Sequence, residues 1–163
     1  MTGATITAAT AAKGSVTSLL TSKPPTDFSG EWLCTDIEGD MGKLLEALGV
    51  GWMSRKAAGA AGYGKGKATT TIEHNGKAEI TVTNVSRMGT KTSTLKTDGS
   101  EQEIESPDGA VATGTLKWEG AALVSTIVQG EKTIAMKRYM RGDLMCLDLT
   151  VGDVSVTRVF TKQ

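Results

Sequence analysis

Two arginines near the C-terminus share strand faces with apolar residues. Arg138 and Arg158 each alternate with such residues at every second position, and successive side chains of a β-strand point to opposite faces. A guanidinium does not lose its charge by deprotonation, so burying it in an apolar interior is unfavourable unless an anion contacts it. The pattern therefore predicts a buried anion site. The residues that share these faces are Ile134, Met136 and Met140 around Arg138, and Val154, Val156 and Phe160 around Arg158.

The chemistry of this predicted site suits an amphipathic acid. The planar fork of an arginine matches a carboxylate or a phosphate. An interior of methionine, isoleucine, valine, phenylalanine and threonine side chains accepts a long apolar tail. Other arrangements are open at this point: the arginines could pair with Asp148 or Glu103, or one could stack on Trp32. A β-bulge could also turn either arginine outward.

Other residue types that often do chemistry are scarce in the sequence. His74 is the only histidine, and its place beside a predicted Asn-Gly turn is typical of an exposed residue. Cys34 and Cys146 lack CxxC spacing, which argues against a zinc site or a disulfide framework and favours two reduced thiols. Residues 62–67 are rich in glycine and lysine but lack P-loop spacing, and no strand precedes them. We expect no cofactor, no metal site and no catalytic residue.

Glycine-containing turns organise most of the chain. After residue 67 they recur at intervals of about 10 to 13 residues, which is typical of an antiparallel sandwich or an up-and-down barrel. Nine strands follow from these turns, and residues 28–37 supply a tenth. Because an open sheet of ten strands leaves two unpaired edges, we expect closure into a barrel. The turns contain Gly76, Gly89, Gly99, Gly109, Gly120, Gly130, Gly142 and Gly152.

Two short helices are predicted between the first and second strands. Asp40 is a favourable N-cap, and apolar residues follow at helical spacing as far as Gly49. A second helical pattern begins at Trp52 and ends at Gly62. We expect every tryptophan to be a packing residue, namely Trp32, Trp52 and Trp118.

Length, charge and hydropathy narrow the class of protein. The chain has 163 residues with 18 basic and 18 acidic side chains, so the basic field of a nucleic-acid-binding protein is absent. No apolar run is long enough to span a membrane, and the N-terminus lacks a secretory pattern, so we expect a cytoplasmic protein. We interpret residues 1–27 as an N-terminal extension, in which residues 8–20 could form a short helix, and residues 28–163 as one barrel domain.

Three segments resemble the intracellular fatty-acid-binding proteins, a family that includes the cellular retinoid-binding proteins. Residues 47–59, Ala-Leu-Gly-Val-Gly-Trp-Met-Ser-Arg-Lys-Ala-Ala-Gly, are similar to the helix-turn-helix signature of that family. The Phe-x-Gly-x-Trp pattern at 28–32 resembles its opening strand, and residues 156–160 resemble its closing strand. Arg138 precedes Arg158 by twenty residues, which is the separation between the two ligand arginines of the family. The resemblance covers residues 28–163.

The resemblance implies both a fold and a function. The fold is all-β: a ten-stranded antiparallel up-and-down β-barrel (β-clam), capped by a helix-turn-helix after the first strand. The function is a carrier, not an enzyme, that binds a long-chain fatty acid or a similar amphipathic carboxylate through Arg138 and Arg158. Phe160 departs from the pattern because many members have there a tyrosine that completes the carboxylate site. Met88 stands at a portal position that is often phenylalanine in the family.

The resemblance also implies how such a carrier delivers its ligand. Lys43, Arg55 and Lys56 lie on the predicted helices, and caps of this family dock on membranes, so we expect transient contact with an anionic membrane surface. We expect a monomer with no nucleic-acid partner.

Other functions compete with the carrier. They are an enzyme that uses Asp148 or Glu103 as an acid or base, a protein-interaction module with a filled barrel, and a carrier of a retinoid or another lipid. Lipocalins share the Gly-x-Trp opening, but the helical pair after the first strand disfavours them.

Overall fold

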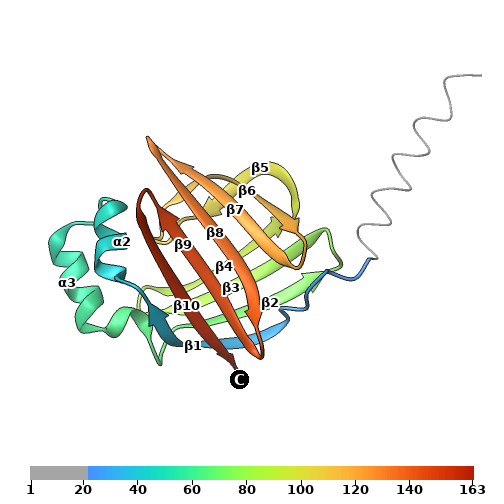
Figure 1. The fold of residues 1–163 in the computed structure, drawn as a ribbon, viewed down its shortest axis with the longest axis horizontal. Coiled ribbons are helices and arrows are strands. Elements are labelled where there is room, and N and C mark those ends of the chain that lie inside the picture. Colours follow the sequence, from blue (N-terminus) through green and yellow to red (C-terminus); the bar gives the residue numbers. More distant parts are fainter. Residues whose placement is uncertain (1–21) are drawn as a thin grey trace, which may run out of the picture.

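The structure, a computed structural model, describes residues 22–163. The helix considered for residues 8–20 lies outside this range. The described chain forms ten strands, with two α-helices and one short 3-10 helix between the first two strands (Figure 1). The elements are β1 (Gly30–Glu38), α2 (Met41–Ala47), α3 (Trp52–Ala60), η1 (Gly62–Gly64), β2 (Thr69–Asn75), β3 (Glu79–Ser86), β4 (Gly89–Lys96), β5 (Asp98–Glu105), β6 (Val111–Glu119), β7 (Ala122–Gln129), β8 (Lys132–Arg141), β9 (Leu144–Val151) and β10 (Val154–Lys162).

The ten strands form one antiparallel sheet that curls into a nearly closed barrel. The strand order is β4-β3-β2-β1-β10-β9-β8-β7-β6-β5, so sequence neighbours pair and β1 pairs with β10. The predicted strand count, the antiparallel barrel and the pair of helices after the first strand are confirmed. The glycines of all eight predicted turns have positive φ, a conformation that glycine adopts without steric penalty.

The closure expected from the sequence is incomplete between β4 and β5, which lie at the two ends of the strand order. Side chains cross this gap instead of a backbone ladder. The amide of Gln102 both accepts from the backbone N–H of Lys96 (2.9 Å) and donates to its carbonyl (2.7 Å). Nearer the helical end, Lys91 Nζ lies 3.2 Å from Glu105 Oε1 and 3.0 Å from the carbonyl of Gly109. Polar contacts therefore satisfy part of the two free strand edges.

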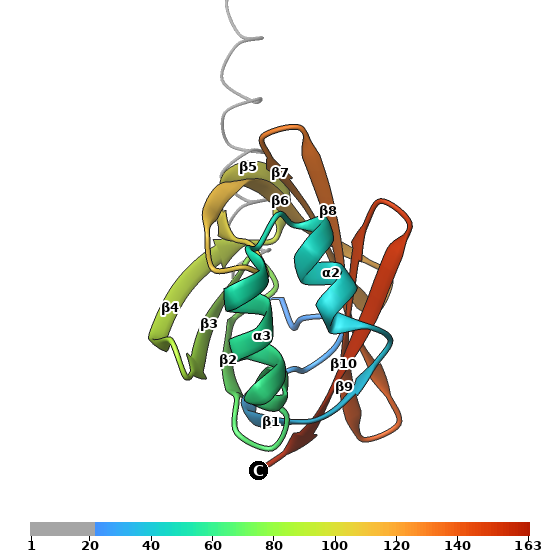
Figure 2. The same cartoon turned by 90° about the vertical axis from the view of Figure 1, so that its left-hand side faces the viewer.

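The helices cover one end of the barrel, as the view in Figure 2 shows. Asp40 caps α2 as predicted, because its Oδ1 accepts a hydrogen bond from the backbone N–H of Lys43 at 3.0 Å. The apolar face of α2 packs into the core through Met41 and Leu44, and Leu48 follows at the helix end. This packing holds the cap on the barrel.

The second helix behaves differently from its predicted role. No residue of α3 is buried, and Trp52 and Met53 are 66% and 69% exposed. The expectation that Trp52 is a packing residue is wrong. Its helical spacing is real, but the alanine-rich helix lies on the outer side of the cap and leaves the first-turn Trp52 facing solvent.

The opposite end of the barrel is closed by a stack of three rings. Phe28 is fully buried and stacks on Trp118 with ring centres 6.0 Å apart, and His74 lies 6.1 Å from Phe28. His74 Nε2 accepts a hydrogen bond from the backbone N–H of Phe28 at 2.9 Å. The expectation that His74 is an exposed turn residue is wrong, because this long-range contact draws it into the stack. Trp32 is 2% exposed, and its indole N–H donates to the carbonyl of Phe28 at 2.8 Å, as a core residue should.

Candidate functional site

The strand register places the two interior arginines on one row of the barrel wall. Arg138 on β8 and Arg158 on β10 both pair with Leu147 on β9, which lies between them. Neighbouring strands are about 4.8 Å apart, so the two arginine backbones are about 10 Å apart across this row. Residues directly opposite one another in a sheet face the same side. Leu147 belongs to the core, so the side chains of both arginines project from the inner face of the sheet.

Arg138 has almost no polar partner. Its Nη1 donates only to the sulfur of Met145, at 3.5 Å, and it takes part in no ion pair within residues 22–163. Burial, and secondly the positive charge of Arg158, lower the pKa of Arg138 to about 10. The group is still charged at neutral pH. Part of the surface of Arg138 remains accessible because its side chain lines an internal cavity.

Arg158 is held by the protein itself. Its Nη2 donates to the carbonyl of Tyr63 in η1 at 3.4 Å, and its guanidinium lies 5.5 Å from the ring centre of Phe160. The Nε atom is buried and has no hydrogen-bond partner among the described residues. Like Arg138, it contacts no carboxylate in this part of the chain.

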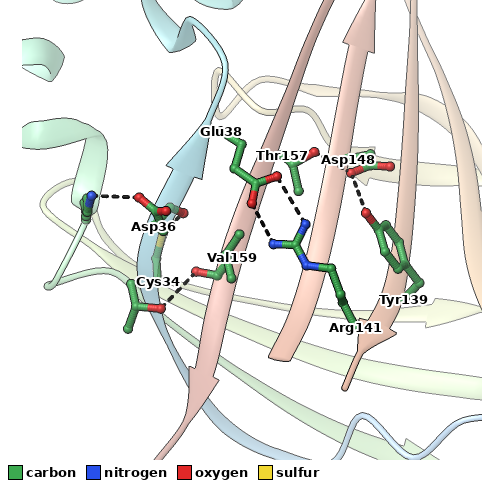
Figure 3. Close-up of polar contacts among 10 residues, drawn as sticks. Cys34, Asp36, Glu38, Tyr139, Arg141, Asp148, Thr157 and Val159 are labelled. Carbon is green, nitrogen blue, oxygen red and sulfur yellow. Dashed lines mark hydrogen bonds and ion pairs between the residues drawn. The ribbon is translucent and has the colours of Figure 1, made fainter. Parts of the chain in front are cut away.

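The internal ion pairs considered from the sequence do not form. Asp148 lies on the outer surface, where its Oδ1 accepts from Tyr139 (3.3 Å) and Thr157 (2.7 Å), as Figure 3 shows for Tyr139. Glu103 is exposed. The cation that stacks on Trp32 is Lys162, not an arginine.

The outer face of the same strands carries a separate polar network (Figure 3). Arg141 on β8 donates two hydrogen bonds to the carboxylate of Glu38 on β1, at 2.6 and 3.2 Å. These bonds hold the pKa of Glu38 below its ordinary value. Cys146 lies on this face but is buried, and burial raises the pKa of its thiol. The network ties strands together and leaves Cys146 in its unreactive thiol form.

A cavity of about 90 Å³ lies inside the barrel beside Arg138. Of the residues predicted to bind ligand, Arg138 and Met136 line it, whereas Arg158, Phe160 and Met140 do not. Met88 is 89% exposed in the turn between β3 and β4, so it does not reach the cavity. The lining residues are Ile80, Val82, Asn84, Ser93, Leu95, Ile104, Glu105, Leu116, Leu123, Ser125, Met136, Arg138 and Leu147.

Sequence reasoning missed the other polar residues of this cavity. Ser125 is 5% exposed, and its Oγ has no partner among the described residues. Its signal was present in the sequence, since it stands between Leu123 and Ile127 at alternate positions of one apolar face. Glu105 also lines the cavity, but Lys91 neutralises its carboxylate.

A wider groove of about 610 Å³ runs between β4 and β5 and shares Ser93, Leu95, Ile104 and Glu105 with the cavity.

Exposed apolar side chains gather at the helical end of the barrel. Of the cap lysines predicted to contact a membrane, Lys43 and Lys56 are exposed. Arg55 is half-buried: it donates to the carbonyl of Val50 at 2.8 Å and lies 3.9 Å from Glu46. The exposed large apolar residues of the described chain are Trp52, Met53, Val85, Met88, Val111 and Val128, and all lie in α3 or near strand ends on the side of the cap.

Metal and membrane-spanning features are not found in residues 22–163. No group of three or more histidine, cysteine, aspartate or glutamate side chains there is arranged to hold a metal ion. No helix in the described range is long and apolar enough to cross a membrane. Cys34 and Cys146 are both free and buried.

Comparison with known proteins identifies the family. The chain is 31% identical over 138 residues to fatty acid-binding protein type 2 of Fasciola hepatica, a match that covers 83% of this chain and 98% of that protein. The chain belongs to the intracellular fatty-acid-binding protein family. No model of a protein family matches the sequence.

Solved structures of similar fold include other proteins of this kind. The fatty acid-binding protein of Schistosoma mansoni in complex with arachidonic acid is 24% identical, with a TM-score of 0.71 over 83% of this chain and 96% of that one. Human cRBP IV is 22% identical, with a TM-score of 0.71 over 85% of this chain and 100% of that one. These likenesses bear on the fold, and they agree with the nearly closed ten-stranded barrel described above.

Proposed function

We propose that the protein is a lipid carrier that binds a long-chain fatty acid, or a similar amphipathic carboxylate, inside the barrel. The observation that carries this proposal is the pair of inward arginines on either side of Leu147, with no carboxylate partner among the described residues. An anion that reaches Arg138 offsets the unfavourable burial of its charge. A free fatty acid brings that anion together with an apolar tail.

The rest of the cavity wall suits such a tail. Eight of the thirteen lining residues are isoleucine, valine, leucine or methionine. Each methylene removed from water contributes about 0.8 kcal/mol, so a chain of a dozen carbons outweighs the cost of ordering it inside the barrel. The second contribution to the binding free energy is the charge-assisted hydrogen bond to Arg138, which is about 1.5 to 3 kcal/mol.

A bound long-chain lipid requires the interior to expand. The cavity of about 90 Å³ is smaller than the roughly 300 to 1,000 Å³ of typical small-molecule pockets. Met136 is an adaptable wall residue because its unbranched side chain has three rotatable bonds. The gap between β4 and β5 is a second source of volume, since the strands there are joined by side-chain contacts and not by a ladder. We therefore expect ligand binding to displace side chains on this wall.

The relatives support the same ligand class. The Fasciola hepatica relative is named a fatty acid-binding protein, and the Schistosoma mansoni structure contains arachidonic acid. In this chain Phe160 is buried and lacks the hydroxyl that many family members carry there. Head-group binding therefore depends mainly on Arg138. The proposed function needs no covalent step.

Delivery of the ligand is proposed to occur at the cap. Trp52 and Met53 offer apolar side chains beside the cations Lys43, Arg55 and Lys56, a combination that suits an anionic lipid surface. We place the carrier in the cytoplasm, where free thiols such as its two buried cysteines persist. We further propose that it acts as a monomer, that residues 28–163 are the lipid-binding unit, and that residues 1–27 are an extension.

The direct test is native mass spectrometry of the purified full chain, followed by extraction and identification of any bound lipid. A co-purified fatty acid, and displacement of a fluorescent fatty acid by it, are the expected results. Delipidated protein should then bind oleate with a defined stoichiometry. A protein that carries no lipid and does not bind oleate, retinol or another long-chain lipid after delipidation would overturn the proposal.

A further inference from the structure

Ser125 is a polar side chain at an inward position of β7. Its neighbours on the same face, Leu123 and Ile127, are buried at 2% and 0% exposure, and Ser125 itself is 5% exposed. Its Oγ makes no hydrogen bond to any described residue. A buried hydroxyl without a partner destabilises the folded protein by about 1 to 3 kcal/mol. A group outside the described protein, such as a bound ligand, could offset this cost.

The register brings Ser125 next to Arg138. Ser125 lies directly opposite Met136 on β8, and Arg138 lies opposite Leu123, two residues further along the same pair of strands. Diagonal neighbours on one face of an antiparallel pair are within about 7 to 8 Å, which is close enough for a long side chain to bridge. Both Ser125 and Arg138 line the same cavity.

The remaining polar residues of the cavity are less suited to receive an anion. Asn84 and Ser93 belong to β3 and β4, across the barrel from Arg138. The hydroxyl of Thr70 donates to the side-chain carbonyl of Asn84 at 2.8 Å, which fixes the Asn84 amide on that opposite wall. Glu105 is a carboxylate paired with Lys91, and it has no hydrogen-bond donor to offer an anion. Ser125 is therefore the hydroxyl donor that lies on the same wall as Arg138.

We propose that Ser125 donates a hydrogen bond to the lipid carboxylate that Arg138 binds, and so positions the head group against β7 and β8. This inference rests on the proposed function. An ionised carboxylate only accepts hydrogen bonds, and its two oxygens have about four acceptor sites. Arg138 fills some of these, and the Ser125 hydroxyl fills another, on a wall where the neighbouring cavity residues Leu123 and Met136 are apolar. Binding then gives oxygen acceptors to Ser125, whose hydroxyl has no partner among the described residues, and to Arg138, whose acceptor within the described chain is a sulfur atom.

The test compares binding of a saturated fatty acid and of the alcohol with the same chain, by titration calorimetry on delipidated protein. Ser125→Ala should weaken acid binding by about 10- to 150-fold, the range for a hydrogen bond to a charged group, and alcohol binding by only a few-fold. Thermal stability of the ligand-free variant should be equal to or above that of the parent, because the variant lacks the unpaired hydroxyl. A residue with only a structural role would lose stability instead. Thr126→Ala, on the exposed face of β7, is the matched control and should change neither affinity.

A second pair of variants separates the hydroxyl from the size of the side chain. Ser125→Thr and Ser125→Val give side chains of the same branched shape, and only the threonine keeps the hydroxyl, so the Thr variant should bind the acid about tenfold or more better than the Val variant. Equal acid affinity for these two variants, together with unchanged acid affinity in Ser125→Ala, would overturn the role of Ser125 and leave the carrier function standing. If the parent protein binds neither acid nor alcohol, the proposed function itself fails.

Discussion

Arg138 is where binding and stability should conflict most clearly. Burial and the charge of Arg158 lower its pKa to about 10. At about 1.4 kcal/mol per pKa unit, this decrease corresponds to an unfavourable interaction of about 3 kcal/mol in the ligand-free protein. Arg138→Met replaces the charged group by an apolar one of similar length, which suits the apolar wall. We expect the ligand-free variant to be more stable than the parent by about 1 to 3 kcal/mol.

The same substitution should impair binding of acids. Loss of the charge-assisted hydrogen bond should weaken fatty-acid binding by about 1.5 to 3 kcal/mol, which is about 10- to 150-fold, and should leave the matching alcohol nearly unaffected. Chemical denaturation of delipidated protein measures the stability, and titration calorimetry measures the two affinities. Lys137→Met, on the exposed face of the same strand, is the control and should change neither quantity. The reasoning would be refuted if the Arg138→Met variant were less stable than the parent, or if it lost affinity for the acid and for the alcohol equally.

Two further predictions concern the two ends of the barrel. Burial lowers the pKa of His74, and the charge of Asp27 acts weakly in the opposite direction. The pKa of His74 in the folded protein is therefore below its unfolded value near 6.5. Its contribution to the free energy of unfolding is complete above pH 6.5 and is lost as the pH falls below that value. Chemical denaturation between pH 7.5 and 5 should show this loss of stability in the parent but not in His74→Gln, whose amide oxygen can still accept a hydrogen bond from the backbone N–H of Phe28. An equal loss in both proteins would contradict the role of His74. At the other end, transfer of a fluorescent fatty acid to vesicles should accelerate with anionic lipid and slow at 1 M salt, where the Debye length is about 3 Å. Lys43→Ala with Lys56→Ala should remove most of this dependence at unchanged affinity, and a transfer rate indifferent to vesicle charge, vesicle concentration and salt would show that the ligand leaves through water.

The sequence predicted the elements whose signals are local. Glycine at each tight turn, alternation along β8 and β10, and a capping aspartate at residue 40 are each decided within a few residues. These signals determine how many strands form and which side chains share a face. They were sufficient for the barrel and for the inward direction of the arginine row.

The features that sequence reasoning missed depend on contacts far along the chain. His74 is partly buried, because the backbone N–H of Phe28, 46 residues away, donates to its ring. Trp52 has the correct helical spacing, but its exposure depends on which side of the cap α3 presents to solvent. The gap between β4 and β5 depends on the curvature of the whole sheet. Ser125 differs from these, since its place on an apolar face was visible in the sequence and only its lack of a partner required the structure.

The two interior arginines differ in how far the protein satisfies them. Arg158 has a carbonyl partner in Tyr63 and an aromatic face in Phe160, so the fold gives it a position without any ligand. Arg138 has only a sulfur atom as an acceptor, and it lines the cavity. Because an unsatisfied charge gains most from an incoming anion, the binding energy of a carboxylate should be concentrated at Arg138. Arg158 contributes positive potential from two strands away and connects the row to the linker that follows α3, so its substitution should disturb the cap as well as the ligand.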